Sequence, residues 1–199
     1  MSKGLKPISE LSRSHKTLLT LVNRVNVDSL IAAHRGQNPK KAPGVDKMTK
    51  QEYGEHLYAN VMNLVGRMKT FTYVPLPVRR TYIPKDGGKF RPLGIPAYED
   101  KLVQSVMADI LIQVYEPRFL DCSYGFRPGR GCHDVVRKVN KALMWGPYKW
   151  VLEADIKGFF DNVNHEWLMT FLKHDIGDPN FLWYIERFLE AGVMEDTQW

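Results

Sequence analysis

The sequence is poor in cysteine, with only Cys122 and Cys132 among its 199 residues. The two stand ten residues apart, without a CxxC pair or a histidine pattern suited to zinc. This spacing argues against both a disulfide framework and a structural zinc site. Such usage fits a reducing, cytoplasmic setting of the bacterial intracellular type.

Other features are missing as well. No apolar run is long enough for a membrane-spanning helix, so no membrane partner is expected. The first six residues lack the apolar core of a secretory signal peptide. The sequence contains no internal repeat and no low-complexity tract. A chain of this length can form one good core, with room for two small lobes.

Positive charge is concentrated in one part of the chain. The whole sequence carries a net charge of +6, from 28 Lys and Arg against 22 Asp and Glu. Residues 35–91 hold 12 of these cations but only 4 of the acids, so the rest of the chain is slightly acidic. A localised basic block indicates a polyanionic partner, whereas a solvated basic surface is the alternative, and both remain open.

Apolar periodicity predicts an α+β fold without regular βαβ alternation. Residues 73–84 and 89–95 flank Asp86-Gly87-Gly88 and predict a β-hairpin, with prolines that make its strands edge-like or interrupted. A strand is also predicted over 150–154. Helices are predicted in the first 35 residues, with Ser9 and Asp28 as caps, and over 49–68, 99–115, 133–144, 165–174 and 180–191.

The most informative segment surrounds Asp155, which follows the apolar run 150–154 and precedes Asp161 by six residues. A carboxylate at the end of a buried strand is costly to desolvate unless it is paired or binds a metal. One interpretation is therefore a divalent metal ligand. The other is a structural acid that caps the next helix or pairs with an arginine, and the residues alone do not decide between them.

Two basic segments could bind phosphate. A hairpin would bring Lys85 and Arg91 to one end, and a triphosphate requires a point charge and a bidentate guanidinium held together. The loop 124–130 carries Arg127, Arg130 and an aromatic residue among glycines, which suits contact with phosphates and bases. The alternatives are a basic surface hairpin and a packing loop with buried aromatic residues and solvated arginines.

Three motifs, in the order in which they follow one another along the chain, resemble the reverse transcriptases encoded by group II introns. They are 83–96 (Ile-Pro-Lys-Asp-Gly-Gly-Lys-Phe-Arg-Pro-Leu-Gly-Ile-Pro), 124–130 (Tyr-Gly-Phe-Arg-Pro-Gly-Arg) and 155–161 (Asp-Ile-Lys-Gly-Phe-Phe-Asp). An upstream segment, Ala-Pro-Gly-Val-Asp at 42–46, resembles the same family. The resemblance implies a right-hand polymerase fold. Residues 1–95 would form an N-terminal helical extension and fingers, and residues 96–199 a partial palm with returning finger segments.

The resemblance also implies roles for single residues. Asp155 would be catalytic and would bind Mg²⁺ together with the backbone carbonyl of Ile156. Lys85 and Arg91 would bind the triphosphate of an incoming deoxynucleotide or stack over its base. Phe160 would lie under the sugar and reject a 2′ hydroxyl, whereas the neighbouring phenylalanine at 159 would belong to the core.

Nucleic acids are the partners that the resemblance implies. Arg127 and Arg130 would line the template side, and Lys40 and Lys41 would contact RNA as well. The reaction would copy RNA into DNA by two-metal phosphoryl transfer, with an RNA template, a DNA primer and group II intron RNA as partners. The alternative is a maturase, an RNA-binding splicing factor whose polymerase chemistry is secondary or lost.

The sequence departs from the family pattern in informative places. Lys47 stands where the family usually has glycine, so a different loop is expected, and Cys132 stands where small residues are frequent. The family's Pro-Gln-Gly segment and Tyr-Ala-Asp-Asp turn would follow residue 199. We therefore expect a fragment that is inactive as a polymerase on its own and that self-associates through exposed palm strands.

Overall fold

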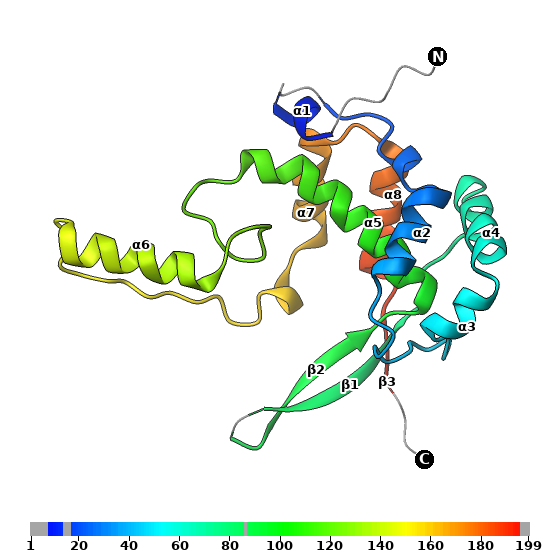
Figure 1. Ribbon diagram of the computed structural model, residues 1–199, viewed down its shortest axis with the longest axis horizontal. Coiled ribbons are helices and arrows are strands. Elements are labelled where there is room, and N and C mark those ends of the chain that lie inside the picture. The colour runs from blue at the N-terminus through cyan, green and yellow to red at the C-terminus, as the bar shows by residue number, and fades with distance from the viewer. Residues whose placement is uncertain (1–7, 14–16, 86, 196–199) are drawn as a thin grey trace.

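The computed structural model describes residues 8–13, 17–85 and 87–195 and shows a mixed arrangement of helices and strands (Figure 1). The α+β class is thereby confirmed. The helices are α1 (Ile8–Arg13), α2 (Val27–Gly36), α3 (Lys50–Glu55), α4 (Leu57–Lys69), α5 (Tyr98–Tyr115), α6 (Cys132–Trp145), α7 (His165–Asp175) and α8 (Pro179–Glu190). The strands are β1 (Val78–Lys85), β2 (Lys89–Ile95) and β3 (Val193–Glu195), and the short 3-10 turns are η1 (Val22–Arg24), η2 (Glu116–Arg118) and η3 (Phe160–Asn162).

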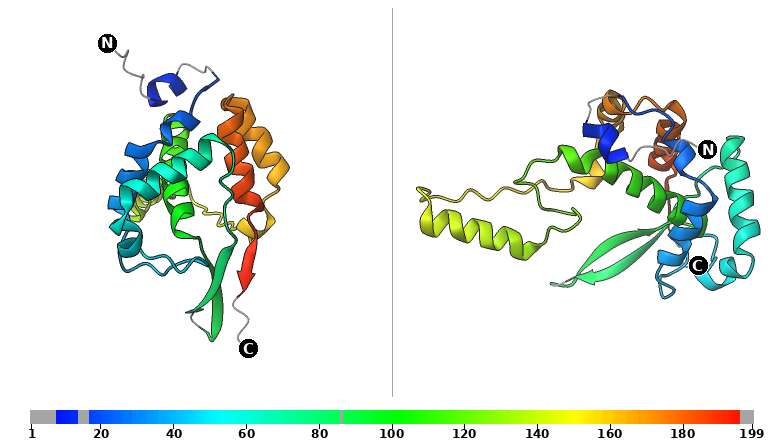
Figure 2. Two further views of the ribbon diagram at one scale, coloured as in Figure 1. Left: turned by 90° about the vertical axis from the view of Figure 1, so that its right-hand side faces the viewer. Right: turned by 45° about the horizontal axis from the view of Figure 1, so that its top comes forward.

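Most of the helices pack around α5 and form what we call the helical body. The apolar face predicted for α5 is buried in it. The face consists of Leu102, Val106, Ile110 and Val114. Helices α1, α2, α4, α7 and α8 lie around α5 in the views of Figures 1 and 2. The buried cluster takes side chains from both sides of residue 95. One core thus spans the expected boundary between fingers and palm, and that boundary remains a prediction.

The expected N-terminal helix is interrupted after α1. Residues 17–21 are irregular, and Leu18 forms a parallel bridge to Ile176 beside the end of α7. The Leu18 N–H donates to the Asp175 carbonyl (3.0 Å), and the Gly177 N–H donates to the Leu18 carbonyl (2.8 Å). The backbone groups of Leu18 therefore bond to a distant segment instead of to a helix of their own, so the helical prediction for the first 35 residues is wrong at 17–21.

Side-chain caps define the next helices. Asn26, not Asp28, caps α2, since its side chain accepts from the Ser29 N–H (3.1 Å). Thr49 caps α3 as predicted and forms a capping box with Glu52. The predicted helix 49–68 divides into α3 and α4 at His56, whose backbone leaves the helical region (φ −124°, ψ 36°).

A three-stranded sheet has the order β2-β1-β3, with β1 antiparallel to β2 and parallel to β3. The hairpin prediction is confirmed, and its turn glycines, Gly87 and Gly88, have φ of +80° and +72°. Pro92 lies on the edge strand β2, and Pro84 lies where β1 pairs with β2 alone, so neither interrupts a pairing on both sides.

One region projects from this body, and we call residues 119–163 the arm. Figures 1 and 2 show α6 extending away from the other helices and the following chain, 146–159, returning beside it. The strand predicted over 150–154 is wrong, because this stretch is irregular, with Trp150 92% and Leu152 93% exposed. Within the ranges that the structure describes, no strand pairs with it. An extended apolar segment does not become a strand without such a partner.

Candidate nucleic-acid interface

The hairpin places its predicted cations on one face. The register pairs Ile83 with Arg91 and Lys85 with Lys89. Residues two apart on a strand share a face, so Lys85, Lys89 and Arg91 project from the same side, with Lys85 and Arg91 as diagonal neighbours about 7–8 Å apart. All three are exposed. The geometry suits a polyphosphate, and binding itself remains a prediction.

The segment 42–46 is fixed against the first turn of α5. Asp46 Oδ2 accepts from the Tyr98 N–H (2.7 Å) and so satisfies an otherwise unpaired donor of that helix end. Gly44 is required for this close approach, because a Cβ there would lie 2.6 Å from Ala97 Cα. The segment 42–46 thus has a structural role at the start of α5, and the sequence alone did not reveal that role.

Lys41 lines a groove of about 600 Å³ between this segment, the end of β2 and α5. Lys101, which sequence reasoning missed, lines the same groove and donates to the Ala42 carbonyl (2.7 Å). Burial lowers the pKa of Lys101, Asp46 opposes that shift, and Lys41 and a nearby arginine add to it. Lys40 and Lys41 are exposed and accessible to a large anion, as their predicted contact with RNA requires.

Lys47 follows this segment with a backbone conformation that disfavours side chains. Its φ is +55°, in the left-handed region where a Cβ costs roughly 1–2 kcal/mol. Its N–H closes a turn onto the Gly44 carbonyl (3.2 Å). The sequence predicts a different loop at this position. The structure shows there a lysine whose backbone conformation is typical of glycine.

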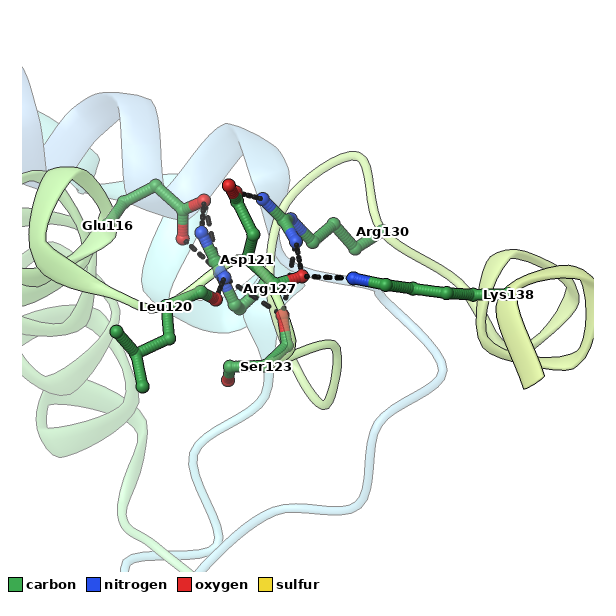
Figure 3. Close-up of polar contacts among 7 residues, drawn as sticks. All are labelled: Glu116, Leu120, Asp121, Ser123, Arg127, Arg130 and Lys138. Atoms are coloured by element: carbon green, nitrogen blue, oxygen red, sulfur yellow. Dashed lines mark hydrogen bonds and ion pairs between the residues drawn. The ribbon is translucent and has the colours of Figure 1, made fainter. Parts of the chain in front are cut away.

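Arg127 is buried, and Figure 3 shows it surrounded by acceptors. Its Nε and Nη2 donate to the Glu116 carboxylate (2.8–3.2 Å), and its Nη1 donates to the carbonyls of Leu120 and Ser123 (both 2.8 Å). This pairing lowers the pKa of Glu116 and raises that of Arg127. The geometry gives Arg127 a structural role, so the prediction that it contacts RNA directly has no support here.

Arg130 lies at the outer side of the same network. It donates to the carbonyl of Asp121 (2.8 Å) and pairs with the Asp121 carboxylate (3.1 Å), which is itself exposed. Its guanidinium lies 5.4 Å from the centre of the Tyr124 ring, and Lys138 of α6 lies at the same distance from that ring. Arg130 and Lys138 form a cationic group at the junction of loop and helix (Figure 3).

Phe126 contradicts the packing-loop alternative, in which the aromatic residues are buried and the arginines solvated. It is fully exposed, whereas the adjacent Arg127 is buried. Its φ is +56°, which is rare for an aromatic residue. At Phe126 and Arg127, the structure therefore shows the reverse of what this alternative predicts.

Asp155 lies on the returning part of the arm, in an exposed irregular segment. It caps no helix, since Phe159 precedes η3, and within the described part of the chain it has no ion-pair partner. Phe160 is 82% exposed, and its ring lies 5.4 Å from that of Phe159. Phe159 is 53% exposed, so its assignment to the core is wrong.

A divalent metal would need more donors than Asp155 provides. Mg²⁺ takes about six oxygen ligands. Among the described residues, no three His, Cys, Asp or Glu side chains lie together as a metal site. The carboxylate of Asp155 and the carbonyl of exposed Ile156 thus do not fit a resident ion by themselves.

In the described ranges, no helix combines the length and apolar character that crossing a bilayer requires.

Both cysteines, Cys122 and Cys132, are exposed thiols outside any disulfide.

Comparison with protein families identifies a match over the second half of the chain. The family model described as "Reverse transcriptase (RNA-dependent DNA polymerase)" matches residues 83–198. The matched region includes the hairpin cations, the loop 124–130 and Asp155. It covers more than half of the chain.

Curated relatives agree with this match. The chain is 41% identical over 140 residues (70% of the chain) to the group II intron-encoded protein LtrA of Lactococcus lactis subsp. cremoris. It is 39% identical over 156 residues (77%) to protein YkfC of Escherichia coli K12, and 33% identical over 95 residues (48%) to nuclear intron maturase 1, mitochondrial, of Arabidopsis thaliana. These matches cover 23%, 41% and 13% of the relatives, so the chain spans less than half of each.

Proposed function

Since the chain belongs to the reverse transcriptase (RNA-dependent DNA polymerase) family, we propose that it forms part of the RNA-directed DNA polymerase of a group II intron. Membership confirms the resemblance drawn from the three motifs. The observation that carries the proposal is the hairpin, whose register sets Lys85 and Arg91 on one exposed face. The similarity to an intron-encoded protein supports the choice of intron RNA as the template.

In this proposal, the hairpin face binds the triphosphate of a deoxynucleotide. Lys85 supplies a compact charge and Arg91 a planar fork that can donate two parallel hydrogen bonds to phosphate oxygens. Phe160 contacts the sugar. Asp155 and the Ile156 carbonyl contribute ligands to a Mg²⁺ site, and we assign no reaction step to them, because the described residues do not complete that site.

RNA template and DNA primer are the proposed partners along the basic surface. The cations that support this are Lys40 and Lys41, which are exposed, and Arg130, which is half-buried and bonded to Asp121. Residues 1–95 would then act as N-terminal extension and fingers, and 96–199 as part of the palm.

A maturase is the second candidate, in which the chain serves to bind intron RNA without polymerase chemistry. The observation that favours it is the missing acidic cluster within the described residues, together with the surplus of cations in residues 35–91. Binding of RNA needs the cations but no metal acid.

The hairpin offers a matched test. Arg91→Gln should weaken binding of a fluorescent deoxynucleoside triphosphate about tenfold, as expected for loss of a charge-assisted pair of hydrogen bonds. Arg80→Gln removes the same charge from the other face of the same hairpin and should change the affinity less than twofold. Equal losses in both variants would refute a specific triphosphate face and leave only a basic hairpin.

Primer extension separates the two candidates. We expect the 199-residue chain to bind structured intron RNA with an affinity that falls steeply with salt, and to incorporate no nucleotide. Incorporation by this chain would contradict the inference that its metal site is incomplete. RNA binding without any triphosphate binding would favour the maturase.

A further inference from the structure

Phe126 combines two unfavourable features that no contact within the described residues offsets. Its backbone has a φ of +56°, which is unfavourable for any residue with a Cβ. Its aromatic ring is fully exposed. Phe71 has a similar φ (+57°), but its ring packs edge-on against Trp183 (5.4 Å) and stacks on Tyr184 (6.3 Å). The ring of Phe71, although 46% exposed, thus packs on two aromatic side chains of α8, whereas the ring of Phe126 projects into water.

The exposure of Phe126 is fixed by the loop that carries it. Immediately after Phe126, Arg127 anchors the chain to Glu116 and to two backbone carbonyls. Arg130 then closes a turn onto Arg127 through its N–H (3.3 Å) and bonds to Asp121. Figure 3 shows these anchors converging on one side of the loop. Because Arg127 bonds back to the Ser123 carbonyl, the strained Phe126 lies inside a closed loop, and strain of this kind is concentrated at functional sites.

The charges near Phe126 indicate what could cover its ring. Arg130 and Lys138 gather around Tyr124, two residues away, and α6 adds the exposed cations Arg137 and Lys141. An apolar protein pocket would have to desolvate these charges. An unpaired nucleotide offers a flat base for the ring and a phosphate for the cations, which is how single strands bind stacking platforms.

We propose that Phe126 stacks on an unpaired base of single-stranded RNA while Arg130 and Lys138 contact the flanking phosphates. The inference rests on the proposed function, because it specifies where the loop 124–130 meets nucleic acid. It predicts tolerance of base identity, since every base has an aromatic face. It also predicts a preference for single strands, because bases within a duplex are already stacked.

The test compares substitutions that keep the ring's volume or its aromatic face. Phe126→Leu should weaken binding to a mixed-sequence single-stranded RNA about tenfold, a typical loss for one stacked base. Phe126→Trp should bind as tightly as the parent. Neither change alters charge, so the slope of affinity against salt should stay the same. The affinity for duplex RNA should be the same in both variants and in the parent.

Two controls make the outcome decisive. Phe171→Leu applies the same change to an exposed phenylalanine on α7 and should leave RNA binding unchanged. Phe126→Gly relieves the backbone strain, so it should fold at least as stably as the parent while losing RNA affinity as Phe126→Leu does. Unaltered affinity in Phe126→Leu, with salt-dependent binding by the parent, would overturn the stacking inference alone. If the parent itself binds no RNA, the proposed function fails with it.

Discussion

The helical body and the arm treat apolar side chains in opposite ways. In the body, helices from both ends of the chain bury one continuous core around α5. In the arm, Arg127 is the only residue among 119–163 that is buried, although α6 and the segment 150–156 are rich in apolar side chains. Their exposed residues include Val136, Met144, Trp145, Trp150, Val151, Leu152 and Ile156. Apolar surface on this scale marks an interaction site in a soluble protein.

Charged groups show the same contrast. Asp100 in α5 is buried, and it accepts hydrogen bonds from the Tyr73 hydroxyl and the Leu76 N–H (3.0 Å). Burial raises its pKa and these bonds oppose the rise. Arg118 pairs with Asp175 in a similar way. Within the described ranges, Asp155 in the arm has no such partner. Acids of the body are tied into the fold, whereas the carboxylate of Asp155 is exposed.

The strongest test of this contrast applies one substitution to both regions. Leu102→Ala removes a fully buried side chain of α5 and should cost about 2–5 kcal/mol in free energy of unfolding. Leu152→Ala in the arm, where the residue is 93% exposed, should stay within about 0.5 kcal/mol. Urea denaturation at low protein concentration measures both. A large cost at Leu152 would show that the arm is buried in solution.

A second copy of the chain is one partner that could bury the arm, as the sequence predicts. We expect the apparent mass in light scattering to rise with concentration, because association would cover the apolar surface of α6 and 150–156. Leu152→Asp should shift this rise to several-fold higher concentration. Phe171→Asp introduces the same charge on α7, outside the arm, and should not. A monomer mass at all concentrations would contradict self-association.

Local patterns predicted much of the body and the hairpin. The apolar spacing of α5, α7 and α8 is regular enough that each was placed within about two residues, which is the ordinary uncertainty of helix ends. The two glycines identified the hairpin turn, and the hairpin was expected to bring Lys85 and Arg91 to one end; that they share a face follows from the observed register. These features depend on neighbours in sequence, which is the information that a pattern contains.

Distant partners account for the errors. Residues 17–21 are irregular because Leu18 bonds to the chain beside Ile176, and nothing near Leu18 signals that contact. The apolar run 150–154 does indicate burial, but the pairing strand that would make it a strand is not among the described residues. In the loop 124–130, composition alone cannot show that Glu116 draws Arg127 inward and leaves Phe126 outside.

Backbone strain in the body provides a smaller test. Lys47→Gly should raise the free energy of unfolding by about 0.5–1 kcal/mol, because glycine adopts φ +55° without a Cβ clash. Lys47→Ala removes the same charge but keeps the Cβ, so it should change stability far less. The two variants separate backbone strain from the loss of a cation. Equal stability of both would contradict strain at this position.

The smallest expected effect is a pH dependence that arises within the body. His34 is buried beside Tyr53 and Tyr98, with Nδ1 2.9 Å from the Tyr98 hydroxyl. Burial lowers its pKa below the ordinary 6.5, and the cations Lys50 and Arg35 lower it further. The unfolded chain therefore takes up a proton at His34 before the folded chain does. Stability should fall as the pH drops below about 6.5 toward the lower folded value.

This dependence should be visible as a decrease of about 1–3 °C in Tm between pH 7.5 and 5.5. His34→Gln removes the titrating group, so its Tm should vary less with pH over that interval even if the variant is less stable throughout. An identical profile in parent and variant would show that His34 is not the source. No buried imidazole lies in the described arm. The hydrogen-exchange protection of arm amides should therefore not change over this pH interval. A matching change in protection there would mean that arm and body unfold as one unit.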